Sequence, residues 1–111
     1  MALEFEKKVA LITGGANGIG RGIANVFAQR GATVIIADIN EKAALDAAKE
    51  IEGLGVESLG VQTDVVDPQS CDGMVASALS MYGKVDILVA NAGVAGGPNW
   101  WTRDFAEAID W

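Results

Sequence analysis

Four short apolar runs recur along the 111-residue chain, and none of them alternates strictly between apolar and polar positions. They span residues 9–12, 33–37, 56–62 and 85–90. Such runs are typical of strands buried on both faces of a parallel sheet, because helices cover both faces of that kind of sheet. The pattern therefore predicts four buried strands.

Between the runs, apolar residues recur at helical spacing and predict three amphipathic helices. The apolar stripes expected to face the sheet are Ile19, Ile23, Val26 and Phe27, then Leu45, Ala48 and Ile51, then Val75, Ala78 and Leu79. The expected helix ends are Gly31, Gly53 and Gly83, and the expected caps are Asn40 and Asp67, the latter followed by Pro68. This alternation predicts right-handed crossovers and an α/β, doubly wound parallel sheet in three layers, with strand order 3-2-1-4.

A glycine-rich segment, TGGANGIG at residues 13–20, joins the first strand to the first helix. Gly14 can adopt the dihedrals of a tight turn, Gly18 has no Cβ to hold a phosphate off the backbone, and Gly20 allows close packing of the helix. Flexible loops also collect glycine, so the interpretation depends on context: a strand before, a helix after, and Asp38 eighteen residues beyond Gly20. Because a helix N-terminus offers free N–H groups and the positive end of a dipole, the segment is predicted to bind pyrophosphate.

Composition narrows the classes of function. Half of the residues are hydrophobic, enough for the core of one domain. No apolar run approaches the roughly 20 residues that cross a bilayer. The net charge of −7 disfavours a nucleic-acid surface, which needs a basic face. The absence of histidine removes Ser-His-Asp schemes and most zinc sites, so we expect no metal ion, and we interpret the single Cys71 as structural. We expect a soluble, cytoplasmic protein that binds neither nucleic acid nor a membrane.

Three further landmarks follow the predicted strands. The second strand ends in Ala37-Asp38-Ile39, the third is followed by Asp64-Val65, and the fourth by Asn91-Ala92-Gly93. Together with the glycine-rich segment, in this order, they resemble the short-chain dehydrogenase/reductase family from about residue 8 to residue 111. The resemblance implies a Rossmann-type sheet. In open sheets of this kind ligands bind at the carboxyl ends of the strands, where all four landmarks are expected.

The resemblance also implies which residues hold a nicotinamide dinucleotide. Gly14, Asn17, Gly18 and Ile19 would surround the pyrophosphate and the adenosine ribose, Asp64 and Val65 would flank the adenine, and Asn91, Ala92 and Gly93 would lie along the nicotinamide-side ribose. By residue type alone, Asp64 is a helix cap or turn former, and residues 91–93 are an ordinary strand-ending turn. The family usually has a second Asn where this chain has Ala90, a departure that concerns a sheet-stabilising hydrogen bond rather than cofactor contact.

Asp38 indicates which dinucleotide is bound. A carboxylate at the end of the second strand can accept two hydrogen bonds from a ribose diol, whereas the 2′-phosphate of NADP would meet like charge there. In NADP-preferring members of the family a basic residue stands just before Gly18 or just after Asp38, and here those positions are Asn17 and Ile39. We therefore predict NAD as the cofactor. Arg21 is interpreted as a solvated residue of the first helix.

The family's catalytic Ser and Tyr-x3-Lys have no counterpart in the 111 residues, so no catalytic residue is assigned. The one tyrosine, Tyr82, is followed by Gly83 and Lys84, and it is interpreted as structural because this spacing is wrong. A fourth helix is predicted from Thr102, and the sequence ends within it. Residues 1–111 are thus interpreted as the NAD-binding, N-terminal part of a longer domain.

Three functions stay open on these grounds. The chain is the NAD(H)-binding part of an oxidoreductase that transfers hydride between an alcohol or carbonyl and a nicotinamide cofactor, a non-catalytic dinucleotide-binding module, or an association fragment. Trp100, Trp101 and Trp111 would line a substrate entrance or cover sheet or subunit surface. The strand at residues 85–90 would leave an open edge with Asp86 as its one charge, so we expect a homo-oligomer or a complementing C-terminal fragment.

Overall fold

The computed structural model describes residues 3–91, in which strands and helices alternate along the chain. The strands are β1 (Val9–Thr13), β2 (Thr33–Asp38), β3 (Ser58–Gln62) and β4 (Ile87–Ala90). The helices are α1 (Gly18–Gln29), α2 (Glu41–Glu52) and α3 (Pro68–Tyr82). All neighbouring strands pair in parallel, in the order β3-β2-β1-β4. The predicted fold class and strand order are confirmed.

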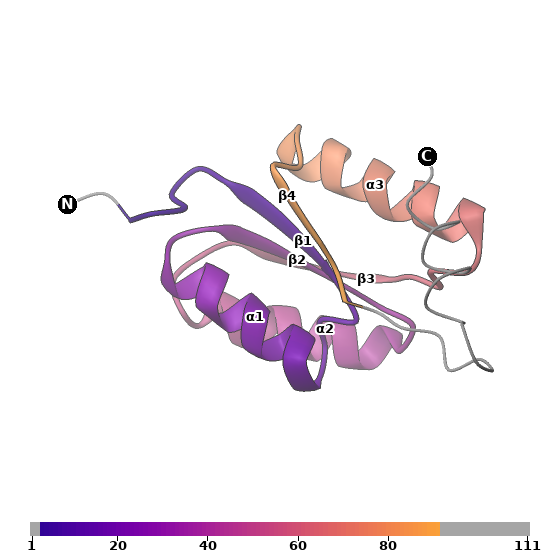
Figure 1. The fold of residues 1–111 in the computed structure, drawn as a ribbon, viewed down its shortest axis with the longest axis horizontal. Coiled ribbons are helices and arrows are strands. Elements are labelled where there is room, and N and C mark those ends of the chain that lie inside the picture. The colour runs from indigo at the N-terminus through magenta and orange to yellow at the C-terminus, as the bar shows by residue number, and fades with distance from the viewer. Residues whose placement is uncertain (1–2, 92–111) are drawn as a thin grey trace.

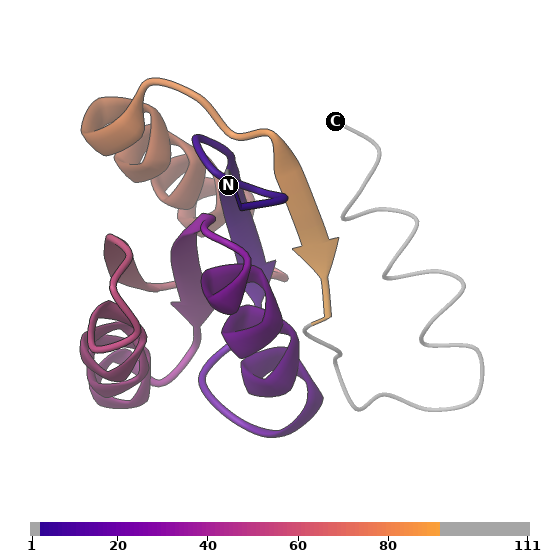
Figure 2. The ribbon, with the colours of Figure 1, turned by 90° about the vertical axis from the view of Figure 1, so that its left-hand side faces the viewer.

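The sheet forms the middle of three layers. Figure 1 shows α1 and α2 on one face of the sheet and α3 on the other. Figure 2 shows the same layers after a quarter turn, with β4 at one edge of the sheet. Right-handed crossovers explain the arrangement: β1-α1-β2 and β2-α2-β3 step in one direction and place two helices on one face. The return step from β3 to β4 places α3 on the opposite face.

The side chains of the central strands are buried on both faces. In β1, Ala10 and Ile12 belong to the core against α1 and α2, whereas Val9 and Leu11 belong to the core against α3. The residues of β2 divide between the two cores in the same alternating way. Both faces therefore select apolar residues, which is why the sequence shows continuous apolar runs here instead of strict alternation.

Small residues make the closest contacts between the helices and the sheet, and this corrects part of the predicted stripes. The predictions that Val26, Leu45 and Leu79 face the sheet are wrong, since these residues are 45%, 51% and 48% exposed. The predictions for Ala48 and Ile51 are confirmed, since both are buried, and the other buried residues of α1 and α2 are Gly20, Ala24, Ala28, Ala44 and Ala47. The approach is close: a Cβ at Gly60 of β3 would lie 2.5 Å from the Ala44 carbonyl oxygen. Large side chains therefore fit beside this contact and not within it.

Two strands begin later than predicted, β3 at Ser58 instead of residue 56 and β4 at Ile87 instead of residue 85. Just before β4, the Asp86 N–H donates to the Val9 carbonyl oxygen at 2.9 Å, and Asp86 Oδ2 accepts from the Val9 N–H at 2.8 Å. The Asp86 side chain thus accepts the hydrogen bond of the Val9 N–H, where a regular strand pair would use a backbone carbonyl oxygen. The same carboxylate pairs with Lys84 at 3.1 Å.

The predicted capping residues are confirmed at α2 and α3. Asn40 Oδ1 accepts from the Ala43 N–H, and Asp67 Oδ1 accepts from the Gln69 N–H, both at 3.0 Å. After α3, Gly83 has φ +78°, in the left-handed region that commonly ends a helix. Side-chain caps therefore close the N-termini of two helices, and α1 is the exception.

Within residues 3–91, no helix is both long enough and apolar enough to cross a membrane. The predictions for Ala92 and Gly93, for the helix from Thr102 and for the three tryptophans lie outside the described residues. The site is accordingly built from the turn after β1 and from the segments that follow β2, β3 and β4.

Candidate cofactor-binding site

The candidate site lies at the carboxyl edge of the sheet, where the segments that follow four strands come together. The register fixes their proximity: Thr13 pairs with Ala37 and Ala90, and Asp38 pairs with Gln62. Because parallel strands all end at one edge, the four sequence landmarks are neighbours in space although they are spread over most of the chain.

The turn after β1 is held by backbone hydrogen bonds to the end of β2. The N–H groups of Gly14 and Gly15 donate to the Ala37 carbonyl oxygen, at 2.7 and 3.4 Å. Gly14 has φ +63°, as a tight turn requires, which confirms the role predicted for it. A Cβ at Gly20 would collide with the Gly14 carbonyl oxygen and lie 2.6 Å from the side-chain nitrogen of Asn91. Close packing at Gly20 is confirmed, with the turn and the end of β4 as its partners.

The N-terminus of α1 is exposed and lacks a side-chain cap. Asn17 occupies the capping position, but its side chain makes no capping hydrogen bond. The helix ladder starts with the Arg21 N–H, which donates to the Asn17 carbonyl oxygen at 3.3 Å, so the N–H groups of Gly18, Ile19 and Gly20 precede it. Gly18 has φ +60°, and a Cβ there would meet nothing within 4 Å. Ile19, predicted to face the sheet, is instead 77% exposed at this edge. Free donors beside open space suit an anionic group.

The carboxylate of Asp38 lies against this turn. Its Oδ2 accepts from the Ala16 N–H at 3.2 Å, and its Oδ1 accepts from the Asn40 N–H at 3.1 Å. The half-buried side chain therefore joins the turn after β1 to the start of α2. The next residue, Ile39, is 65% exposed. Acceptor oxygens next to exposed apolar surface suit a ribose and an aromatic base.

The segment after β3 forms a turn around Asp64. Asp64 Oδ1 accepts from the Val66 N–H at 3.1 Å, and the Asp64 N–H donates to Ser70 Oγ at 2.8 Å. The Cys71 thiol lies 3.6 Å from the Val65 carbonyl oxygen, to which it donates. One oxygen of the Asp64 carboxylate is thus used to form the turn, which is the structural role that its residue type suggests.

Asn91 joins the end of β4 to the glycine-rich turn. Its N–H donates to Thr13 Oγ1 at 3.0 Å, and its Nδ2 donates to the Gly14 carbonyl oxygen at 3.2 Å. The strand itself stays paired with β1 through Ala90 and Thr13, at the position where the sequence departs from the family pattern. Asn91 therefore fixes the relative position of two segments of the site.

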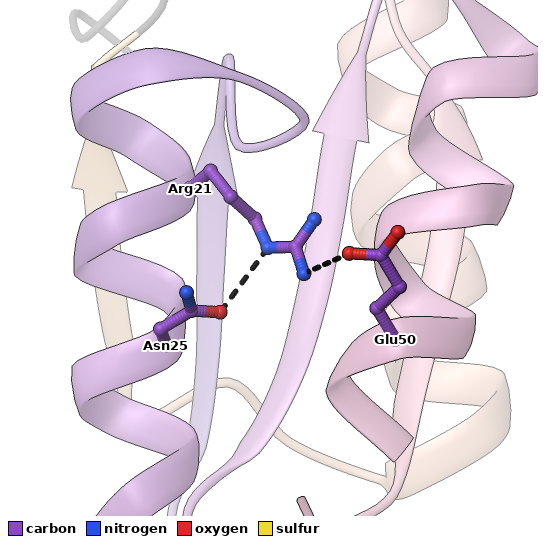
Figure 3. Close-up of polar contacts among 3 residues, drawn as sticks. All are labelled: Arg21, Asn25 and Glu50. Carbon is purple, nitrogen blue, oxygen red and sulfur yellow. Dashed lines mark hydrogen bonds and ion pairs between the residues drawn. The ribbon is translucent and has the colours of Figure 1, made fainter. Parts of the chain in front are cut away.

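Arg21 is not the solvated residue that the sequence suggested. Its side chain is 21% exposed and lies between α1 and α2, where Nη2 is 2.7 Å from Glu50 Oε2 and Nε donates to Asn25 Oδ1 at 3.1 Å (Figure 3). Asn25 is one helical turn beyond Arg21, on the side away from the helix N-terminus. The guanidinium therefore links the two helices, with its positive charge beside Glu50.

The hydroxyl of Tyr82 and the thiol of Cys71 show no sign of activation. Tyr82 ends α3, which leads into the start of β4, so it lies toward the amino ends of the strands, away from the candidate site. Burial, followed by the negative charges of Glu57 and Glu52, raises the pKa of its hydroxyl. Burial also raises the pKa of the Cys71 thiol, with a further contribution from Asp67. A thiol with a raised pKa is a poor nucleophile, because only the thiolate attacks.

Sequence reasoning missed some polar groups that shape the site. Ser70 Oγ accepts a hydrogen bond from the Asp64 N–H. The local signal for this contact is the predicted cap at Asp67, which places the first turn of α3 beside the segment around Asp64. The bond between the Asn91 side chain and the Gly14 carbonyl oxygen joins residues 77 positions apart. No local pattern predicts such a contact, since it depends on the sheet register.

Comparison with known proteins gives the family. A family model described as short chain dehydrogenase matches residues 8–110. The chain is 44% identical over 96 residues to 7alpha-hydroxysteroid dehydrogenase of Escherichia coli K12, and 42% identical over 95 residues to cis-4-hydroxycyclohexanecarboxylate dehydrogenase of Sinomonas cyclohexanicum. Each alignment covers 86% of this chain. A short-chain type dehydrogenase/reductase from Mycobacterium marinum has a similar crystal structure, with a TM-score of 0.79 and 36% identity over 86% of this chain and 37% of that one. The chain belongs to the short-chain dehydrogenase family.

Members of this family bind a nicotinamide cofactor, NAD or NADP. The alignments span 37% of the Escherichia coli relative and 38% of the Sinomonas relative, so the chain corresponds to little more than a third of their length. The residues of the site fit such a cofactor: the uncapped N-terminus of α1 and the open space at Gly18 suit its pyrophosphate.

Proposed function

We propose that the chain is the NAD-binding part of an oxidoreductase that transfers hydride between an alcohol or carbonyl substrate and the nicotinamide cofactor. The observation that carries the proposal is the position of the Asp38 carboxylate, hydrogen-bonded to the turn that leads into an uncapped helix N-terminus. Backbone donors for a pyrophosphate and carboxylate acceptors for a ribose thus lie next to each other. The similarity to dehydrogenases supports this function over a non-catalytic module or an association fragment.

The individual residues take the following parts in the proposal. The pyrophosphate and adenosine ribose would be held by Gly14, Asn17, Gly18, Ile19 and Asp38. The adenine would lie between segments that contain Ile39, Asp64 and Val65, and the nicotinamide-side ribose would lie along Asn91, Ala92 and Gly93. When bound, the nicotinamide supplies the hydride acceptor or donor, while the residues of this chain bind and orient the dinucleotide.

The choice of NAD over NADP follows from charge at the adenosine ribose. A 2′-phosphate beside Asp38 would place two negative charges together, at a cost of several kcal/mol. The neighbouring side chains Asn17 and Ile39 offer no compensating positive charge. The nearest basic residue along α1, Arg21, is paired with Glu50 at 2.7 Å. NAD, whose ribose diol can donate to the carboxylate, is therefore the better ligand.

The proposal extends to partners and location. We expect an alcohol or carbonyl of low molecular weight as substrate only when the remaining part of the enzyme is supplied, and no nucleic-acid ligand, in view of the net charge of −7. We also expect a cytoplasmic protein. By itself the 111-residue chain is expected to bind NAD and to oxidise no alcohol, because it contains no Tyr-x3-Lys sequence.

Titration of the chain with NAD and with NADP, followed by tryptophan fluorescence or calorimetry, tests the proposal. We expect tighter binding of NAD. In Asp38→Ala, NAD should bind more weakly by about 1–3 kcal/mol, because ribose hydroxyls lose a charged acceptor, while NADP becomes relatively better. A preference for NADP in the wild-type chain would contradict the proposal, as would NADH formation from an alcohol by the chain alone.

A matched control distinguishes the loss of a contact at the site from the loss of one negative charge on the protein. Asp46, on α2, pairs with Lys42 at 2.8 Å, and its side chain is 60% exposed. Asp46→Ala removes the same charge as Asp38→Ala, but from the outer surface of the helix. We expect the ratio of NAD to NADP affinity to stay at the wild-type value in Asp46→Ala. An unchanged ratio in Asp38→Ala would show that this carboxylate does not contact the ribose.

A further inference from the structure

We infer that Asp38 has a second role, in which it holds the glycine-rich turn in its binding shape before any nucleotide arrives. The inference rests on the proposed function in one respect, since it takes this turn as the pyrophosphate site. It assigns to one carboxylate both the recognition of the ribose and the positioning of the neighbouring phosphate donors.

The turn is tied to β2 by three consecutive backbone N–H groups. Those of Gly14 and Gly15 donate to the Ala37 carbonyl oxygen, at 2.7 and 3.4 Å. The third, that of Ala16, donates to Asp38 Oδ2 at 3.2 Å. The two ties to backbone depend only on the fold, whereas the third depends on a side chain that a substitution can remove.

The carboxylate that receives the third tie is itself fixed. Asp38 Oδ1 accepts from the Asn40 N–H at 3.1 Å, and Asn40 in turn caps α2 through the Ala43 N–H at 3.0 Å. The side chain thus bridges the turn after β1 and the start of α2. Its geometry is set by both segments, so it can restrain the turn without help from a ligand.

The residues that follow Ala16 have fewer contacts: the Asn17 carbonyl oxygen accepts from the Arg21 N–H at 3.3 Å. Asn17 and Gly18, the next two residues, are exposed, and the side chain of Asn17 makes no capping hydrogen bond. A Cβ at Gly18 would meet nothing within 4 Å. The bond from Ala16 to Asp38 is therefore the last hydrogen bond to a side chain before the donors proposed to face the phosphate. Without it, those donors lose preorganisation, and a ligand must order them on binding.

Ribose recognition and turn positioning do not compete for the same acceptor sites. A carboxylate offers about four lone-pair sites on its two oxygens, and the two backbone N–H groups use one on each. Two hydroxyl donors can therefore bind without displacing either tie. It follows that removal of Asp38 weakens phosphate binding even for a ligand that has no ribose hydroxyls.

Amide hydrogen exchange of the nucleotide-free chain tests the structural half of the inference. In Asp38→Ala, we expect the Ala16 amide to exchange about tenfold faster than in the wild type, the change expected for loss of one hydrogen bond to a charged group. The Leu11 amide in β1 should exchange at the wild-type rate, which shows that the fold is retained, and Asp46→Ala should leave Ala16 unchanged. Equal exchange of Ala16 in Asp38→Ala and wild type would overturn the inference.

Binding of 2′,3′-dideoxyadenosine 5′-diphosphate, which has a pyrophosphate but no ribose diol, tests the functional half. If Asp38 positions the turn, Asp38→Ala should bind this probe several-fold more weakly than Asp46→Ala. Equal or tighter binding by Asp38→Ala would overturn this half. Failure of the wild-type chain to bind NAD would instead refute the proposed function, while the exchange result at Ala16 would still decide the structural role.

Discussion

Two glycines near the N-terminus of α1, two residues apart, are predicted to respond in opposite ways to the same substitution. A Cβ at Gly20 would collide with the Gly14 carbonyl oxygen and lie 2.6 Å from the Asn91 side-chain nitrogen. A Cβ at Gly22 would meet nothing within 4 Å. Gly20→Ala and Gly22→Ala therefore add the same methyl group to the same helix, once where the turn leaves no room and once where space is open.

The magnitudes follow from these surroundings. Alanine in place of an interior helical glycine stabilises a helix by about 1 kcal/mol, and Gly22→Ala should show most of this gain. At Gly20 the obstructing atoms belong to the backbone of the turn, so α1 must shift. Overpacking of this kind typically costs about 1–3 kcal/mol. Because both substitutions gain the same helix propensity, we expect the free energies of unfolding of the two variants to differ by this overpacking cost, about 1–3 kcal/mol.

Urea unfolding followed by circular dichroism measures this difference, and a parallel NAD titration measures its effect on the site. Gly20→Ala should have the lower midpoint and the weaker NAD binding, because the shift moves the turn that Asn91 and Asp38 hold. Gly22→Ala should bind NAD as the wild type does. Equal stability of the two variants would refute the close approach of α1 to the turn. Wild-type NAD affinity in Gly20→Ala would show that this packing does not affect NAD binding.

Three other outcomes are expected. Gly18→Val should weaken NAD and NADP alike, since a β-branched residue is strained at φ +60° although space is open, and wild-type titrations with both nucleotides would contradict this. The Val9 N–H and then Lys84 lower the pKa of the Asp86 carboxyl, so the stability that this carboxylate contributes is present above its unfolded pKa and is lost as the pH falls through its folded pKa. Asp86→Asn should therefore be less stable than the wild type at pH 7 and should lose less stability on acidification below about pH 4. Identical pH profiles of stability for the two proteins would refute this role. Within residues 3–91, β4 pairs only with β1, so sedimentation at micromolar concentration should show association, and a stable, cooperatively folding monomer would oppose it.

The elements of the fold could be predicted because their signals are local. The apolar run of β2, the Asn40 cap and the glycine after α3 each act within a few residues, and the structure confirms all of them. Which side of each helix faces the sheet depends on how close the helix lies, and that distance is a property of the packed structure. This is why Leu45 and Leu79 were wrongly expected to be buried.

The site divides in the same way. The glycine-rich turn and Asp38 are recognisable from residue type and spacing, because a tight turn needs positive φ and a ribose site needs an acceptor at a strand end. The bond from Ala16 to Asp38 and the bond from Asn91 to Gly14 join segments brought together only by the sheet register. The pairing of Arg21 with Glu50 likewise depends on how α1 and α2 lie side by side.

A dinucleotide site at the carboxyl ends of the strands is tested directly by the backbone amide chemical shifts of the isotope-labelled chain on addition of NAD. We expect the largest changes at Asn17, Gly18 and Ile19, whose N–H groups precede the hydrogen-bonded ladder of α1, with further changes at Asp38 and Ile39. We expect none around Lys84 and Asp86, at the amino ends of the strands. Changes confined to the amino ends, or no change at saturating NAD, would contradict a dinucleotide site at the carboxyl edge.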